Sequence, residues 1–272
     1  MKKLLSAVIT LFLLFTLCGC TKTEKAETFG VWWWNSDLSD QYLQFAQDNG
    51  VTEIYYCDSA FDEGTLHFIK SASKRKIKVY WLAGEYQWIY DSTPLYKKIE
   101  RFTAFQNANA GNNFAGVHLD IEPHQAPDFS ENRAMLLEKL VSLVYNLSVD
   151  YPDIKFDYDI PFWIDDGITF NGTTLPAYAH IINYSHRTFL MSYRDTAEAI
   201  YATAKDEIEY AKSVGKTVIL GVETYSEEGN MVSFMEEGKK YMYDEIAKLK
   251  TMIPKSFGVS VHQIKTWYDL KD

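Results

Sequence analysis

Eight short runs of apolar, β-branched and aromatic residues recur along the chain, and stretches of helical periodicity separate them. Parallel strands need a helical crossover between them, so this alternation of strand and helix predicts a parallel sheet. Eight repeats predict that the sheet closes, giving an α/β fold that is a single (β/α)8 TIM barrel. The sequence ends soon after the eighth run, so we expect the last helix to be short or absent. The runs are Phe29–Trp34, Thr52–Tyr56, Ile77–Leu82, Phe114–Ile121, Ile154–Phe162, Thr188–Tyr193, Thr217–Val222 and Phe257–Ile264.

The segments between the runs are amphipathic and predict helices. An open doubly wound sheet is the alternative, but no G-x-G-x-x-G or P-loop sequence follows any of the runs, which favours the barrel. No linker or change of composition divides residues 29–272, so we expect one domain there. The clearest helical segments are Asp40–Asp48, Thr65–Lys74, Leu95–Asn107, Arg133–Asn146, Ala197–Ser213 and Phe234–Met252.

The first 28 residues differ from the rest of the chain. Lys2 and Lys3 precede an apolar run that ends at Leu17, which is too short for the about 18 apolar residues of a membrane-spanning helix and is typical of an export signal. The sequence around Cys20 resembles the lipobox of bacterial lipoproteins. We therefore expect a signal peptide at residues 1–19, lipidation (palmitate) of Cys20 and an anchor linker at 20–28. An ordinary secretory signal peptide that is cleaved near Cys20, without lipidation, is the alternative.

The charge and cysteine content limit the possible partners. The chain has 27 basic and 37 acidic residues, a net charge of −10, and loss of the signal peptide with Lys2 and Lys3 makes the mature chain more acidic still. Such a chain is not suited to nucleic acid. Cys20 and Cys57 are the cysteines left after cleavage, so we expect no disulfide framework. We also expect no cofactor and no metal, a monomer, and contact with the bacterial cell membrane only through the lipid anchor, on its extracytoplasmic side.

The fourth run carries three ionisable side chains at alternate positions. Because successive side chains of a strand point to opposite faces, His118, Asp120 and Glu122 are expected to face the barrel lumen. Barrel enzymes act at the C-terminal ends of their strands, which is where Glu122 falls. Carboxylates two residues apart on one strand lie roughly 6.5 Å apart, a spacing that suits acid–base chemistry on a sugar. A buried structural network, or a metal site that includes His118, is the alternative.

Aromatic and polar residues near other strand ends favour a carbohydrate cleft, because aromatic faces stack on sugar rings. The chain has 19 tyrosines and 7 tryptophans. For each single tryptophan, core packing is the alternative, and His262 is expected to be a core histidine. The segment Asp165–Pro176 is expected to lie over the barrel mouth. The side chains considered for substrate binding are Trp32, Trp33, Trp34, Trp81, Trp88, Trp163, Glu85, Asp159 and Glu223.

Two short motifs resemble those of family 18 glycoside hydrolases, the chitinase and endo-β-N-acetylglucosaminidase group. The segment from Gly116 to Glu122 resembles the family's D-G-x-D-x-D-x-E, and Met191-Ser192-Tyr193-Arg194 is similar to its M-x-Y-D. Trp267 lies in the region where the family often has a sugar-stacking tryptophan. The resemblance implies that Glu122 is the general acid, that Asp120 and Tyr193 hold the substrate's acetamido group, and that the N-acetyl oxygen is the nucleophile.

The sequence also departs from that family at three positions. Ala115 and His118 stand at the first two Asp positions of the motif, and Arg194 stands at the Asp after the tyrosine. His118 is expected to hydrogen-bond Asp120 from below and to take part in substrate binding. We expect a cell-surface glycoside hydrolase acting on an N-acetylhexosamine-containing glycan. The alternatives are a non-catalytic glycan-binding lipoprotein and a metal-assisted deacetylase or amidase.

Overall fold

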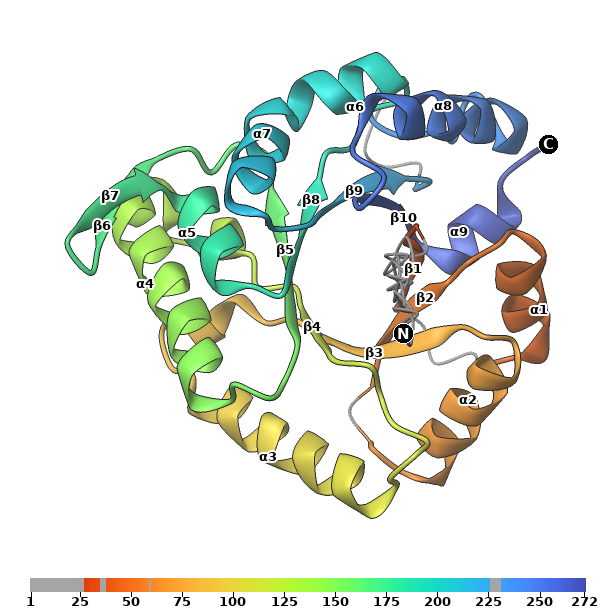
Figure 1. The fold of residues 1–272 in the computed structure, drawn as a ribbon, viewed down its shortest axis with the longest axis horizontal. Coiled ribbons are helices and arrows are strands. Elements are labelled where there is room, and N and C mark those ends of the chain that lie inside the picture. The colour runs from red at the N-terminus through yellow and green to blue at the C-terminus, as the bar shows by residue number, and fades with distance from the viewer. Residues whose placement is uncertain (1–26, 35–37, 59, 226–230) are drawn as a thin grey trace, which may run out of the picture.

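The computed structural model describes residues 27–34, 38–58, 60–225 and 231–272. Within these ranges, eight parallel strands close into a barrel and helices surround it (Figure 1). The order around the barrel is β1-β10-β9-β8-β5-β4-β3-β2. The predicted single (β/α)8 barrel is therefore confirmed. Its strands are β1 (Phe29–Trp33), β2 (Glu53–Cys57), β3 (Lys78–Ala83), β4 (Val117–Leu119), β5 (Phe156–Pro161), β8 (Arg187–Met191), β9 (Val218–Glu223) and β10 (Gly258–His262).

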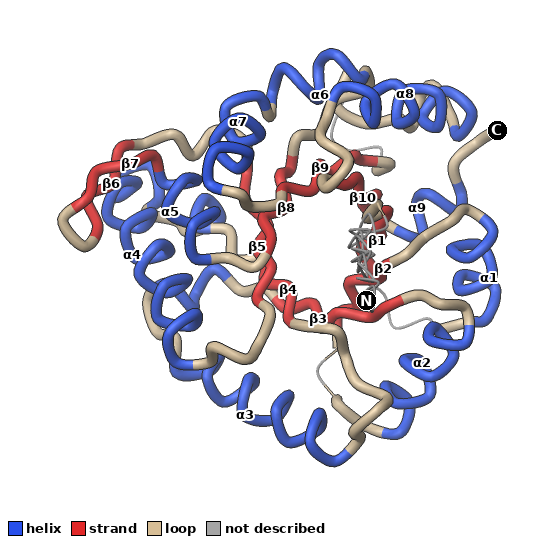
Figure 2. The backbone as a smooth tube through the Cα atoms, in the orientation of Figure 1, coloured by secondary structure: helices blue, strands red, loops and turns tan. Residues whose placement is uncertain are grey.

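The helices form the outer ring in Figure 2. The predicted segment Ala197–Ser213 is two helices rather than one, because the chain leaves helical geometry at Ala204. The last helix has six residues and is short, as expected. The helices are α1 (Asp40–Asp48), α2 (Glu63–Lys74), α3 (Thr93–Ala108), α4 (Phe129–Asp150), α5 (Ala177–Tyr184), α6 (Ala197–Thr203), α7 (Lys205–Val214), α8 (Lys239–Met252) and α9 (Ile264–Asp269), with short 3-10 turns η1 (Tyr86–Ile89) and η2 (Pro123–Gln125).

A β-hairpin is inserted between β5 and α5. Its strands are β6 (Gly167–Phe170) and β7 (Thr173–Pro176), which pair antiparallel. Asn171 and Gly172 join them with φ values of 49° and 79°, the left-handed geometry that a tight hairpin turn requires. The hairpin lies against α4 and α5, outside the ring of helices (Figure 1). The expectation that this segment covers the barrel mouth is therefore wrong.

The barrel wall separates two groups of buried side chains. One group fills the lumen and contains Trp32, Tyr55, Tyr80 and Phe189. The other, larger group lies between the strands and the helices and contains residues such as Val31, which neighbours Trp32 on β1. Adjacent residues of one strand thus belong to different cores, as the alternation of strand side chains requires. The lumen is packed with side chains and forms the base on which the mouth residues stand.

A buried ion cluster closes the N-terminal end of the lumen. Arg187, the first residue of β8, lies 2.5 Å from Asp157 and 2.6 Å from Glu53. Its guanidinium carbon also lies 4.8 Å from the centre of the Tyr80 ring. Burial alone would raise the pKa of Asp157, but the charge of Arg187 and the hydrogen bond from His186 outweigh it, so that this pKa is lowered. Arg187 thereby compensates charge that would otherwise be buried unpaired.

The N-terminal expectations lie outside the described residues. Cys20, the signal peptide and the linker up to residue 26 belong to the part of the chain that the structure does not describe. In the described part, none of the helices combines the length and the apolar character needed to cross a membrane.

Candidate active site

The end of β4 carries the two carboxylates of the predicted site. Leu119 and Ile121 are buried against the helices, whereas His118 lies in the lumen against Tyr55 and Phe189. The alternation predicted for this strand is therefore present. Asp120 and Glu122 continue the lumen-facing series beyond the last residue of the strand. The backbone N–H of Asp120 donates to the carbonyl of Ala83 at 3.0 Å, which holds the chain extended between the two carboxylates.

His118 pairs with a carboxylate of the neighbouring strand. Its Nε2 lies 2.7 Å from Oδ2 of Asp159 on β5, and the indole N–H of Trp32 donates to the same oxygen at 3.0 Å. Both partners are buried. The expectations that His118 bonds Asp120 and binds substrate are wrong, because its polar contacts go to Asp159 and Trp32 and no part of its side chain reaches solvent. It positions Asp159 from below.

Asp120 lies in an environment that favours its neutral form. Burial raises its pKa well above the ordinary value, and the negative charges of Asp159 and Glu122 raise it further. Its Oδ1 is buried and has no hydrogen-bond partner among the described residues. In its neutral form Asp120 would donate a hydrogen bond to a ligand at the barrel mouth.

Glu122 is partly accessible, with 14% of its side chain exposed. It accepts a hydrogen bond from Gln125, and Nε2 of His124 lies 3.7 Å from its Oε2. Burial lowers the pKa of His124, which favours the neutral imidazole beside Glu122. The ring of His124 lies 5.2 Å from that of Trp163. The predicted aromatic Trp163 therefore packs against the histidine that neighbours the predicted acid.

Tyr193 follows β8, at the same end of the barrel as the predicted carboxylates. Burial raises the pKa of its phenol well above the ordinary value, and the charges of Glu223, Asp159 and Glu122 add to this. The phenol is thus protonated, and carboxyl groups on or just after β4, β5 and β9 are near enough to act on it electrostatically. Gly221 on β9 leaves room for it, since a Cβ there would lie 3.1 Å from Cε1 of Tyr193.

A second histidine stands between Glu223 and Trp34. Nδ1 of His262 lies 2.7 Å from Oε2 of Glu223, and the indole N–H of Trp34 donates to Nε2 of His262 at 2.9 Å. Because Nε2 accepts, the proton of a neutral ring is on Nδ1 and is donated to Glu223. The His262 ring stacks on Tyr193 at 6.0 Å. His262 is therefore a residue of the barrel mouth and not of the outer core.

Glu223 supports His262 and does not face a ligand. Its Oε1 accepts the backbone N–H groups of Thr224 and Tyr225 at 2.7 and 2.8 Å, and 1% of the residue is exposed. The expectation that Glu223 binds substrate is therefore wrong. Trp34 was considered as one of three adjacent tryptophans, whereas His262 was expected to be a core histidine and was not considered for the site.

Three of the tryptophans expected to bind substrate face the helices. Trp33, Trp81 and Trp267 are 0%, 1% and 0% exposed and belong to the outer core. Trp33 packs on Phe68 of α2, and Trp81 stacks on Phe102 of α3. No face of these rings is available to a sugar, so the expectation is wrong for all three. Trp163 remains a candidate, because it is only partly buried.

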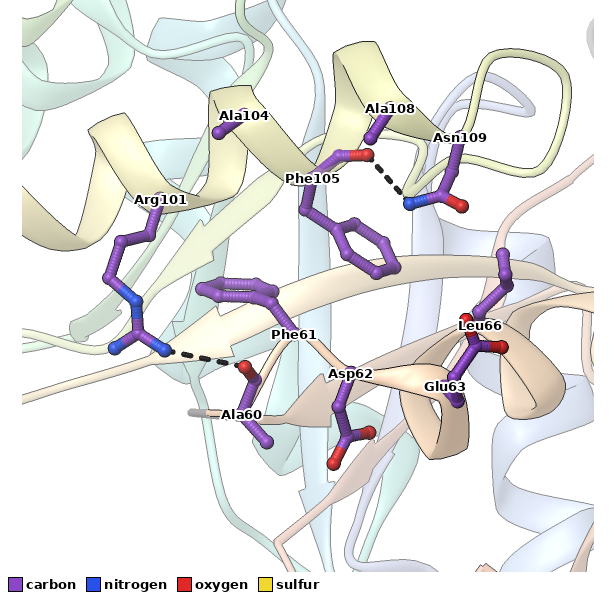
Figure 3. Close-up of a pocket in the computed structure, with 10 residues that line it drawn as sticks. All are labelled: Ala60, Phe61, Asp62, Glu63, Leu66, Arg101, Ala104, Phe105, Ala108 and Asn109. Carbon is purple, nitrogen blue, oxygen red and sulfur yellow. Dashed lines mark hydrogen bonds between the residues drawn. The ribbon is translucent and has the colours of Figure 1, made fainter.

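Other features of the described residues lie away from the mouth. No group of three or more His, Cys, Asp and Glu in this part of the chain is arranged to hold a metal ion. A cavity of about 610 Å³ lies between α2 and α3, in the outer ring of helices (Figure 3). Arg101 crosses it to donate to the carbonyl of Ala60 and lies over the Phe61 ring. This cavity contains no paired carboxylates facing one another, so we assign the candidate site to the mouth.

Comparison with known proteins gives structural neighbours only. No family model and no curated protein matches the sequence. The C-terminal domain of Legionella pneumophila ChiA aligns with a TM-score of 0.52 at 13% identity, over 88% of this chain and 93% of that one. The Bacillus cereus spore cortex-lytic enzyme SleL aligns with 0.55 at 10%, over 89% and 73%. A GH18 chitinase from Cycas revoluta, in complex with (GlcNAc)3, aligns with 0.53 at 12%, over 89% and 96%. The chain therefore has the same barrel fold as these structures.

Proposed function

We propose that this chain is a glycoside hydrolase that acts on an N-acetylhexosamine-containing glycan. One observation carries the proposal: Asp120, Glu122 and Tyr193 follow the C-terminal ends of β4 and β8, near enough for electrostatic interaction, and burial and neighbouring charge raise the pKa of Asp120. A carboxyl pair whose members have different environments suits a reaction that needs an acid and a second group in another role. Binding alone does not require such a pair.

The substrate class is argued from the motifs and the mouth residues, and two structural neighbours agree with it. The Cycas revoluta chitinase was solved with (GlcNAc)3, and SleL is described as a spore cortex-lytic enzyme. The motifs from Gly116 to Glu122 and from Met191 to Arg194 point in the same direction, since they resemble those of family 18 glycoside hydrolases. At 10% to 12% identity the neighbours establish the fold alone, so the substrate class rests on the motifs together with the mouth residues.

In the proposed reaction Glu122 protonates the glycosidic oxygen as the bond between that oxygen and C1 breaks. The acetamido oxygen of the same sugar forms the new bond to C1. Asp120 and the phenol of Tyr193 hold that acetamido group in position. Water then attacks C1, the bond to the acetamido oxygen breaks, and the proton of the water returns to Glu122. Asp159 and His118 act through Asp120 and are positioning residues.

The test is hydrolysis of aryl N-acetylglucosaminide and chitooligosaccharide reporters by the chain from Thr21 onward, which retains every described residue. We expect turnover in the wild type and a loss of about 100-fold or more in Glu122→Gln, with an unchanged melting temperature. Asp120→Asn is expected to lose activity as well, and Lys139→Gln serves as a surface control. Turnover that persists in Glu122→Gln would overturn the assignment of the acid.

A non-catalytic glycan-binding protein is the second candidate, and the replacement of two motif positions by His118 and Arg194 favours it. The same experiment separates the two functions. Glycan binding retained by the wild type, Glu122→Gln and Asp120→Asn, with no turnover of any reporter, would support the binding protein and contradict the hydrolase.

We further propose that the chain acts at the extracytoplasmic face of the bacterial cell membrane, attached through a lipid on Cys20. The sequence around Cys20 is the basis of this proposal. The full chain is expected to incorporate radiolabelled palmitate and to partition with detergent, and Cys20→Ser is expected to abolish both. Cys57→Ser is the matched control, because Cys57 lies at the end of β2 in the folded barrel. Labelling that survives in Cys20→Ser would contradict the proposal.

A further inference from the structure

Arg194 is held in place at the barrel mouth. It follows Tyr193 in the loop after β8, and its Nη1 donates to the Tyr193 carbonyl at 2.6 Å. Its guanidinium carbon lies 5.0 Å from the centre of the Phe162 ring, which follows the neighbouring strand β5. The residue is half-buried. Stacking and a backbone hydrogen bond therefore fix a side chain that is otherwise flexible.

This guanidinium has no acidic partner within ion-pair distance in the described part of the chain, although carboxylates are abundant. Arg133 lies 2.6 Å from Asp166, and Arg187 lies 2.5 Å from Asp157. The N–H groups of Arg194 that do not bond the Tyr193 carbonyl have no acceptor among the described residues. A guanidinium has five N–H donors in a planar fork. Arg194 is therefore an ordered cation with most of its donors uncommitted.

The placement of Arg194 gives the mouth two regions of opposite charge. The carboxyl groups of Asp120, Glu122 and Asp159 act electrostatically on the Tyr193 phenol, whereas the guanidinium of the next residue lies over Phe162. The net charge of −10 does not prevent local attraction of an anion, since charges farther than about 8 Å away are largely screened at physiological ionic strength. A guanidinium with an open fork fits a carboxylate, which it can bind through two parallel hydrogen bonds.

We propose that Arg194 binds a carboxylate carried by the glycan, next to the sugar held at Asp120 and Glu122. The inference rests on the proposed function and specifies its substrate: an anionic glycan rather than a neutral polymer. The carboxylate is that of a lactyl ether on a hexosamine or that of a uronic acid. In both, a planar carboxylate accepts the uncommitted N–H groups of Arg194, and Tyr193 fixes the distance to the reacting sugar.

The test is calorimetric binding in a Glu122→Gln background, where hydrolysis does not interfere. The ligand is an oligosaccharide of alternating N-acetylglucosamine and lactyl-substituted N-acetylglucosamine, compared with the same oligosaccharide after reduction of its carboxylates to alcohols. A uronate-containing N-acetylhexosamine oligosaccharide forms the second arm. Tighter binding of one of the two acidic ligands identifies the source of the carboxylate, and weak binding of both, with no preference over the reduced form, overturns the proposal.

Arg194→Gln is expected to weaken binding of the preferred acidic ligand about 10- to 100-fold and to leave the affinity for the reduced ligand unchanged. Arg194→Lys is expected to retain part of the affinity, because it keeps the charge and loses the fork. Arg101→Gln, on the outer ring of helices, is the matched control. Equal loss for acidic and reduced ligands would overturn the proposal and indicate a structural role for Arg194.

The hydrolase and the anion site at Arg194 are tested separately. With Glu122 intact, Arg194→Gln is expected to lose more of its rate on the acidic oligosaccharide than on the neutral chitooligosaccharide reporter. Absence of turnover in the wild type, together with carboxylate-dependent binding that requires Arg194, would contradict the hydrolase and support the anion site. Turnover of the neutral reporter, with no dependence of binding on the carboxylate, would support the hydrolase and contradict the anion site.

Discussion

Nε2 of His118 and Oδ2 of Asp159 lie 2.7 Å apart inside the barrel, where both residues are buried. The contact joins β4 to β5 directly below the mouth. It also leaves Oδ1 of Asp159 without a hydrogen-bond partner among the described residues, and Oδ1 of Asp120 is in the same situation. The charge of Asp159 is one cause of the raised pKa of Asp120. The His118–Asp159 pair thus affects the protonation of the site although neither residue reaches solvent.

The first prediction concerns the protonation of Asp120. Asp159→Asn removes a neighbouring negative charge, so the pKa of Asp120 is expected to fall toward its ordinary value. If catalysis needs neutral Asp120, activity is lost as pH rises through that pKa, and this alkaline limb moves to lower pH in the variant. Titration of ¹³C-labelled Asp carboxyls and the pH–rate profile measure the two effects. Glu223→Gln is the control, since Glu223 is not among the causes of the Asp120 shift. An unmoved Asp120 pKa in Asp159→Asn contradicts the prediction.

A second prediction concerns the space that Gly221 leaves for Tyr193. In Gly221→Ala the new Cβ would lie 2.8 Å from the Leu190 carbonyl oxygen and 3.1 Å from Cε1 of Tyr193. We expect a stability loss of about 1–3 kcal/mol and a large loss of kcat. Gly116→Ala is the matched variant, because its Cβ would lie 2.7 Å from the Lys155 carbonyl at the other end of β4. It is expected to cost similar stability with kcat retained, and equal kcat losses in the two variants would argue against a role for Tyr193.

Third, Arg187→Met leaves Asp157 and Glu53 buried without their cation. The expected loss of unfolding free energy at pH 7 is about 3–5 kcal/mol, measured by urea denaturation. Asp157 has a lowered pKa in the fold. The stability that Asp157 contributes is therefore present at pH values above its unfolded pKa near 3.9. It is lost as the pH falls through the lower pKa of the folded state. The difference between wild type and Arg187→Met is expected to shrink in acid.

The control for this third prediction adds Asp157→Asn and Glu53→Gln to Arg187→Met, which removes the unpaired charges together. Most of the lost stability is expected to return, since replacing a whole buried ion cluster costs less than breaking it. A triple variant as unstable as Arg187→Met would point to lost packing on Tyr80 and Phe189, and not to unpaired charge, as the cause.

A fourth prediction concerns Glu207 on α7. Burial raises its pKa to about 7, with help from Asp206 and Asp165. The folded chain therefore holds this proton more tightly than the unfolded chain, and stability falls as pH rises from about 4.5 to about 7. The free energy of unfolding of Glu207→Gln is expected to exceed that of the wild type by about 1–3 kcal/mol at pH 8 and to be similar to it at pH 4.5. Denaturation curves at the two pH values measure this, with the exposed Glu209→Gln as control. A gain that is equal at both pH values would rule out the titration of Glu207 as its cause.

The sequence predicts the barrel because its signal is repeated and local. Most strand runs are apolar on both sides, as is typical of parallel strands covered by helices, and the eight runs alternate with amphipathic helices. The hairpin after β5 also had a local signal, the Asn171-Gly172 pair between alternating residues, and it was overlooked. Its position against α4 and α5 depends on packing and is not encoded in that signal.

The errors at the site have two physical causes. A run such as Trp32-Trp33-Trp34 is apolar at every position, so it does not indicate which ring faces the lumen. On β4 the polar residues alternate, and there the facing was predicted. The pairing of His118 with Asp159 depends on how β4 lies beside β5, where His118 is in register with Asp157. No sequence pattern specifies that register.

The barrel also has a direction. β1 begins at Phe29, and the parallel pairings of β1 with β2, β2 with β3 and β3 with β4 show that β4 runs in the same direction as β1. Asp120 and Glu122 follow the last residue of β4, so they lie at the opposite end of the barrel from Phe29. The chain thus enters at the floor of the barrel, opposite the opening. Residues 20–27 span at most about 25 Å when extended. The lipid that we propose on Cys20 would hold the floor of the barrel close to the bilayer, with the opening turned away from it. The opening would then be accessible to a polymer outside the membrane rather than to molecules embedded in the bilayer.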